Sequence, residues 1–184
     1  MEMSSRTARV QNLVLKASKG DQEAFGDLYE MYLDQIYRYV FFRVGNQQDA
    51  EDLTENSFVK AWQALLNNPK DPIRNFNAWI YRIAKNQVTD HFRKKKPVLM
   101  EEIVQTQEIT EDGPEDVLIL DDTFEELAAA MGKLDERSYQ VIQLRFLSHL
   151  SHAETAAVLE LEEGHIRILQ YRALKKLRAA MMKD

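Results

Sequence analysis

Residues 151–178 read SHAETAAVLELEEGHIRILQYRALKKLR. Ser151, followed three residues later by Glu154, matches the pattern of a capping box, which begins a helix. Small alanines follow it, and a short break leads into a longer segment rich in Lys and Arg. A short helix, a break and a longer basic helix are typical of a helix-turn-helix. We therefore expect helices over 151–160 and 162–182.

The same kind of pattern continues towards the N-terminus of this segment. Apolar residues at spacings of three and four predict two further helices, over 123–131 and 135–147. Within the basic helix, Ile166, Ala173 and Leu177 share one side and should face a core.

Residues 1–96 are also expected to be helical. Asp21 can cap a helix that ends at Val44, before the break Gly45-Asn46. Its apolar side holds Phe25, Leu28, Tyr29, Tyr32, Leu33, Ile36, Tyr37 and Val40. A second helix is expected over 49–66, ending before two prolines, and a third, capped by Asn75 or Asn77, reaches Lys94.

Charge is distributed unevenly along the chain. The net charge is −6, yet residues 97–132 contain eleven acidic residues and no Lys or Arg. Both flanks are mildly basic, so the acidity belongs to one middle segment. High like charge and a weak apolar pattern predict a flexible linker over 97–121. The expected fold class is all-α: two small helical domains, 1–96 and 122–184, joined by this acidic linker, the second with the helix-turn-helix.

Composition excludes several classes of protein. The chain has no Cys, so disulfides and thiolate zinc sites are excluded. Neither a signal-peptide core nor an apolar run of membrane-spanning length is present, which predicts a cytoplasmic protein without membrane insertion. No phosphate-binding glycine loop, serine nucleophile elbow or pair of catalytic acids occurs. We therefore expect no catalytic residue, no metal and no cofactor.

The basic C-terminal helix is the first candidate for binding. Arg167, Arg172, Lys175, Lys176 and Arg178 place cations along its exposed side. A recognition helix needs long donors for base edges and cations for phosphates. The alternative is a solvated basic helix whose C-terminus favours cations. The short helix before it favours DNA binding.

The third N-terminal helix is the second candidate. Arg82, Asn86, Thr89 and Arg93 share a face, with Lys85 beside it and aromatic residues at the start of the helix. Cations interleaved with aromatic rings suit a single nucleic-acid strand. The alternative is that the aromatic rings form part of the core, which we favour for Trp79.

The acidic run from Asp49 to Glu55 is the third candidate. It could bind a metal through Asp49, Asp52 and Glu55, it could simply suit the start of a helix, or it could dock a protein. The residues leave these three readings open. A metal-dependent nuclease is the function that the first of them implies.

Several segments of the chain together resemble a known family, the extracytoplasmic-function sigma factors of the sigma-70 family. Residues 49–62 (DAEDLTENSFVKAW) resemble its polymerase-docking region, and residues 76–90 (FNAWIYRIAKNQVTD) resemble its promoter-opening, minus-ten-reading helix. The segments LDER (134–137), VIQLRF (141–146), AETA (153–156) and RALKKLR (172–178) resemble its minus-thirty-five-reading domain.

The resemblance implies a function and partners. The protein would carry RNA polymerase core enzyme to promoters and help to open them, binding duplex DNA and the non-template single strand. An anti-sigma factor is expected as a further partner. The acidic linker would thread a basic channel of the polymerase. The alternative function is a free-standing helix-turn-helix regulator whose N-terminal domain senses a ligand or dimerises.

The resemblance also implies roles for individual residues. The clamp helices of the largest polymerase subunit would meet Asp49, Glu51, Asp52, Leu53, Thr54 and Glu55. The minus-ten DNA would meet Arg74, Asn75, Phe76, Asn77, Trp79, Tyr81, Arg82, Lys85, Asn86, Thr89 and Arg93. The minus-thirty-five DNA would meet Ser151, His165, Arg167, Gln170, Tyr171, Arg172 and Lys175.

The chain departs from the family pattern at the recognition helix. Family members often carry Thr-Val-Lys-Ser-Arg after the first glycine, whereas Gly164 is here followed by HIRIL (165–169). Glu160 also replaces a glycine that is frequent in the turn. The groove contacts, and with them the promoter sequence, therefore do not follow from the family pattern.

Overall fold

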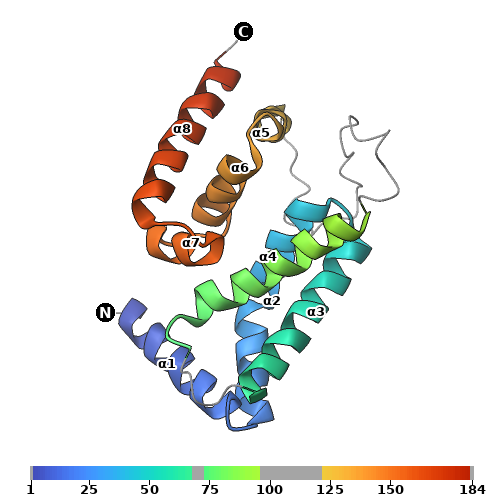
Figure 1. Cartoon of the computed structure of the whole chain (residues 1–184), viewed down its shortest axis with the longest axis vertical. Coiled ribbons are helices and arrows are strands. Elements are labelled where there is room, and N and C mark those ends of the chain that lie inside the picture. The colour runs from blue at the N-terminus through green and yellow to red at the C-terminus, as the bar shows by residue number, and fades with distance from the viewer. Residues whose placement is uncertain (1, 68–72, 96–121, 183–184) are drawn as a thin grey trace. The chain divides into compact units, whose positions relative to one another are not determined.

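The computed structural model describes residues 2–67, 73–95 and 122–182. The chain divides into two compact units, residues 1–110 and 111–184. Every regular element within the described ranges is a helix, which confirms the all-α fold class (Figure 1). The predicted linker, 97–121, lies outside the described residues.

The N-terminal unit contains four helices: α1 (Glu2–Ala17), α2 (Gln22–Val44), α3 (Gln47–Asn67) and α4 (Phe76–Lys95). α2, α3 and α4 pack against one another in pairs, and α1 packs mainly on α2 (Figure 1). α1 precedes the helices that we delimited from the sequence. Its buried side holds Val10, Leu13, Val14 and Ala17. Their spacing of three and four is the signal that identifies it.

The caps predicted from the sequence mark the starts of α2 and α4 and the end of α2. Asp21 accepts a hydrogen bond from the Ala24 backbone at 3.0 Å and caps α2, and Gly45 ends it with φ 74°. Asn75 accepts from the Ala78 backbone at 3.0 Å, so it is Asn75, and not Asn77, that caps α4. α3 begins two residues earlier than expected, because Asn46 accepts a hydrogen bond from the Asp49 backbone at 2.8 Å.

The apolar side of α2 divides into two lines. Leu28, Tyr32, Ile36 and Val40 are buried in the core of the unit. The second line, also at four-residue intervals, is Phe25, Tyr29, Leu33 and Tyr37, and it is half-buried or exposed. Only one of the two apolar lines of α2 is therefore buried in the core of this unit.

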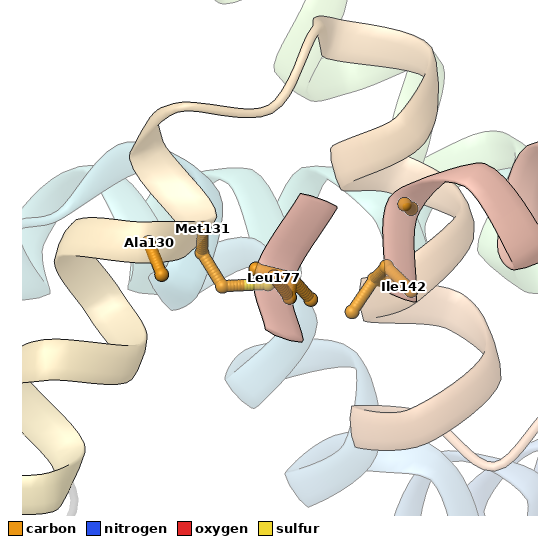
Figure 2. Packing of buried hydrophobic residues seen from close by; sticks show 5 residues of the cluster. Ala130, Met131, Ile142 and Leu177 are labelled. Carbon is orange, nitrogen blue, oxygen red and sulfur yellow. The ribbon is translucent and has the colours of Figure 1, made fainter. Parts of the chain in front are cut away.

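The C-terminal unit contains α5 (Asp122–Gly132), α6 (Glu136–Ile142), α7 (His152–Leu159) and α8 (Glu163–Met181). One cluster joins α5, α6 and α8: the Met131 side chain meets Leu177, and Ile142 points towards the same place (Figure 2). A second cluster joins α6, α7 and α8 through Val141, Ala156 and Ile166. Ile166, Ala173 and Leu177 are all buried, which confirms the side of α8 predicted to face the core.

A π-helical turn, Gln143–Leu147, replaces the second half of the single helix that the sequence predicts over 135–147. The Ser148 backbone N–H donates to the Gln143 carbonyl at 3.0 Å, five residues back. The wider turn allows the four consecutive residues 141–144 to be buried together. The helix propensities of single residues do not encode this requirement.

The turn between α7 and α8 contains a strained residue. The capping box is formed as predicted: Ser151 accepts from the Glu154 backbone at 3.1 Å, and the Glu154 carboxylate accepts from the Ser151 backbone at 2.8 Å. At the other end of α7, Glu160 adopts the left-handed conformation with φ 56°.

Within the described ranges, none of the helices combines the length and apolar character that crossing a bilayer requires.

We predict that Glu160→Gly stabilises the C-terminal unit by about 0.5–1 kcal/mol, because glycine adopts a positive φ without a Cβ clash. Urea unfolding followed by circular dichroism measures the change. Trp62 and Trp79, the two tryptophans of the chain, lie in the N-terminal unit, so their fluorescence midpoint should not move. Glu160→Ala keeps the Cβ and should not stabilise; an equal gain in both variants would contradict the argument.

We also predict an acid-dependent contribution from Asp135, which caps α6. Hydrogen bonds from the Ser138 backbone and hydroxyl, with a smaller contribution from Lys176, lower the pKa of this carboxyl to about 2. The folded pKa lies below the unfolded value, so the stabilisation is complete above pH about 4 and is lost as the pH falls towards 2.

Asp135→Asn keeps a capping oxygen but removes the charge. At pH 7 it should lower the free energy of unfolding by less than about 1 kcal/mol, because the carboxyl is exposed and screened. In urea titrations this difference from the parent chain should shrink between pH 5 and pH 2.5. A difference that stays constant over this range would refute the assignment.

Candidate functional site

A groove of about 620 Å³ runs between α2 and α3. The second apolar line of α2 forms one wall, and α3 forms the other. Its lining consists of Gln22, Phe25, Tyr29, Leu33, Tyr37, Glu51, Thr54, Glu55, Phe58, Val59, Trp62 and Gln63.

Aromatic rings connect the two walls. Phe25 and Trp62 have ring centroids 4.8 Å apart, and Tyr29 and Phe58 have theirs 4.7 Å apart. Tyr29 and Val59 nevertheless stay exposed. Thr54 is only 2% exposed, and its Oγ1 has no hydrogen-bond partner within the described part of the chain. The groove thus combines apolar walls with a buried polar atom that is not satisfied internally.

The rim of the groove is acidic. Glu51 and Glu55 line it, and both are exposed. Burial, and then the nearby Glu51 carboxylate, raise the pKa of Tyr37, so its hydroxyl remains a donor over the physiological range. An apolar groove with a negative rim suits a helix that has an apolar stripe flanked by cations.

Asp49 is held inside the N-terminal unit. Its Oδ2 lies 3.3 Å from Nε2 of His91 on α4 and accepts a hydrogen bond from Asn46 at 2.6 Å. These contacts connect the start of α3 to the end of α4. The sequence predicts Asp49 as a docking carboxylate, and the structure assigns it mainly to this internal contact.

The other predicted docking residues occupy different positions. Glu51, Asp52 and Glu55 are exposed and Leu53 is half-buried. Thr54, also expected to face a partner, lies buried at the floor of the groove, so only a partner that enters the groove could meet it. The aromatic walls are missing from the sequence prediction, although the four-residue spacing of Phe25, Tyr29, Leu33 and Tyr37 could have indicated them.

α4 presents the polar face that the sequence predicts. Arg82, Asn86, Thr89 and Arg93 are exposed, and Lys85 is half-buried beside them. Thr89 donates its hydroxyl hydrogen to the Lys85 carbonyl at 2.8 Å, and Arg93 pairs with Asp90 at 3.2 Å. Arg82 thus lies at the N-terminal end of this exposed cationic and amide face.

The segment before α4 is connected to α1. Gln11 of α1 donates to the Arg74 carbonyl at 3.4 Å, and the Arg74 and Asn75 side chains are exposed. Asn77 is half-buried. Part of the predicted loop, residues 68–72, lies outside the described residues.

Two of the predicted minus-ten residues are core residues. Tyr81 is 0% exposed and packs edge-on against Tyr39 at 5.4 Å, and Phe76 packs against Tyr32 at 5.2 Å. Their rings cannot contact DNA in this conformation, and that part of the prediction is wrong. Trp79 is half-buried against Phe76 at 5.5 Å, as the core interpretation expects.

α8 carries the predicted cations on its exposed side. His165, Arg167, Tyr171, Arg172 and Lys175 are all exposed. Arg167 pairs with Glu163, one turn earlier. Gln170 is half-buried, and its oxygen accepts from Arg145 Nε at 3.0 Å. This hydrogen bond gives Gln170 a structural role, because it joins the π-helical turn to α8.

Ser151 has a structural role as the cap of α7 and remains exposed. Within the described ranges, no group of three or more acidic or histidine side chains is arranged to hold a metal ion.

Comparison with known proteins identifies the two units. The sigma-70 region 2 model matches residues 28–98, and the sigma-70 region 4 model matches residues 130–179. The ECF RNA polymerase sigma factor BldN of Streptomyces coelicolor is 38% identical over 183 residues, covering 98% of this chain and 69% of BldN. The ECF RNA polymerase sigma factor SigW of Bacillus subtilis is 31% identical, covering 92% of this chain and 95% of SigW.

A solved structure agrees with this. CnrH, known from Cupriavidus metallidurans, in complex with the cytosolic domain of CnrY, is 28% identical with a TM-score of 0.73, covering 96% of this chain and 99% of CnrH. The presence of both regions in one chain does not favour a free-standing regulator. The chain belongs to the extracytoplasmic-function sigma factors of the sigma-70 family, and it directs RNA polymerase to promoters.

Proposed function

We propose that the groove between α2 and α3 is the surface by which this sigma factor docks on RNA polymerase. The acidic rim and aromatic walls of the groove are the observation that carries this proposal. A partner helix places apolar side chains against Tyr29 and Val59, while its cations meet Glu51 and Glu55. The resemblance to the family names this helix as one of the clamp helices of the largest subunit.

The unsatisfied hydroxyl of Thr54 supports the same proposal. A buried hydroxyl without a partner costs about 1–3 kcal/mol. A polar group of a docked helix would satisfy it, so part of the cost of folding is recovered on binding. Asp52 is also exposed in the first turns of α3, next to Glu51 in sequence, and adds negative charge near the rim.

We propose that the exposed face of α4 captures the non-template strand at the minus-ten element. Arg82, Asn86 and Arg93 supply phosphate and base-edge donors along the helix. Arg74, Asn75 and Asn77 lie where the chain enters α4, at the edge that would receive an unstacked base. Flipping a base costs a few kcal/mol, which such contacts must offset.

We propose that α8 enters the major groove at the minus-thirty-five element. Arg167 near its start and Lys175 two turns later match the division between base-reading and phosphate-binding residues. Tyr171 lies between them and is 69% exposed. Ser151, at the start of α7, is placed to donate to a phosphate.

The remaining parts of the proposal concern partners and location. We propose that residues 97–121 form the acidic linker between domains 1–96 and 122–184 and thread a basic channel of the polymerase. The protein acts in the cytoplasm without catalytic residues or cofactors. An anti-sigma factor controls it, in line with the complex in which CnrH is held by the cytosolic domain of CnrY.

We predict that Glu51→Lys combined with Glu55→Lys weakens binding to core polymerase by about tenfold or more, because the rim then repels the cations of its partner. Anisotropy of the labelled full chain, titrated with purified core enzyme, measures the affinity. Glu30→Lys, an exposed reversal on α2 outside the groove, is the matched control and should bind as the parent does.

Thr54→Val tests the floor of the groove in the same titration. Removal of the unpaired hydroxyl should stabilise the free chain, while the affinity for core enzyme falls. If the groove variants and Glu30→Lys lost affinity equally, only overall charge would matter. Unchanged affinity in all of them would place docking elsewhere.

We predict that Arg82→Ala slows promoter opening about tenfold, since a lost arginine contact to DNA costs about 1–3 kcal/mol. Its affinity for core enzyme should not change. The readout is transcription from a duplex promoter and from the same promoter with a pre-melted minus-ten region, which should restore part of the rate. Lys60→Ala, an exposed cation on α3, should behave as the parent. Equal defects on both templates would argue against a role in opening.

A further inference from the structure

The outer face of α8 differs in chemistry from its inner face. Ile166, Ala173 and Leu177 are buried against the rest of the unit. At 100° per residue, the opposite side of the helix holds Gly164, Ile168, Tyr171 and Lys175. Arg167 and Arg172 lie on either flank of this line. The face therefore consists of an apolar centre within a cationic frame.

Ile168 is the residue on this face that folding does not explain. Its side chain is 51% exposed, although isoleucine usually occupies cores and is a weaker helix former than the straight-chain residues. A residue of this kind in the first half of a recognition helix contributes nothing to the core. Its neighbours Arg167 and Arg172 make the surroundings suitable for an anion.

Gly164 provides an independent observation one turn earlier on the same face. Its φ does not require glycine, and a Cβ added there would meet nothing within 4 Å. Gly164 is the second residue of α8, and glycine loses more conformational freedom on folding than alanine does. No contact within the C-terminal unit accounts for this cost. The open space beside Gly164 lies on the outside of the C-terminal unit, where another molecule can approach the helix backbone.

A partner that presents an apolar group among anions would account for both the exposed Ile168 and the open space beside Gly164. In the major groove of DNA, phosphates supply the anions, and the C5-methyl group of thymine is the apolar group that a side chain can read. We propose that Ile168 is a specificity-determining residue that contacts a thymine methyl in the upstream promoter element, and that Gly164 allows the close approach. This inference rests on the proposed role of α8.

The test uses deoxyuridine, which differs from thymidine at this position only by the absence of the methyl group. The holoenzyme, reconstituted from the full chain and core polymerase, first selects upstream elements from a randomised duplex library. Each thymine of the selected element is then replaced in turn by deoxyuridine, and the affinity of the holoenzyme is measured.

For the parent chain, deoxyuridine at one position should weaken binding about three- to fivefold, the value expected for one buried methyl group. Ile168→Ser should bind the thymine and deoxyuridine duplexes equally, whereas Ile168→Val should retain most of the discrimination. Gly164→Ala should raise the thermal stability of the free chain and yet weaken binding to the selected element.

The outcomes separate the inference from the function on which it rests. If the holoenzyme selects no upstream element, the role of α8 in promoter reading fails. If it selects one but no thymine methyl matters, or if Ile168→Ser discriminates as the parent does, the assignment of Ile168 is overturned. Loss of core-enzyme affinity in Ile168→Ser, with DNA reading intact, would assign the residue to a protein contact and would also overturn the proposal.

Discussion

The groove of the N-terminal unit depends on the aromatic contacts between α2 and α3. Phe25 with Trp62 and Tyr29 with Phe58 hold the two helices together, and the same rings form the walls of the groove. A side of a helix that packs in the core is not available to a partner. α2 divides its apolar side into a buried line and a parallel half-exposed line, so the wall of the groove lies directly beside the packed core.

Charge is separated by helix as well as by segment. Acidic side chains gather at the rim of the groove, while cations gather on the outer faces of α4 and α8. This separation explains how a chain with a net charge of −6 can serve DNA. In the proposed function, the acidic rim meets the polymerase and the cationic faces meet DNA, so each of these surfaces would repel the ligand of the other.

The sequence predicted the helices well because local signals define them. Asp21, Gly45, Asn75 and Ser151 act through contacts with residues three or four positions away, which are visible in the sequence. The errors concern tertiary contacts. Tyr81, Phe76 and Thr54 were assigned to DNA or polymerase contacts through the family resemblance, yet packing between helices buries them. The π-helical turn and the contact of Gln170 with Arg145 likewise depend on residues far apart in the chain.

The π-helical turn also bears on how this unit can change during evolution. A π turn holds one residue more than an α turn, so a deletion within 143–147 converts it to ordinary helix and leaves the hydrogen-bond ladders on both sides intact. Because Arg145 starts from this turn and reaches α8, a change in length there would re-aim the recognition helix in a single mutational step.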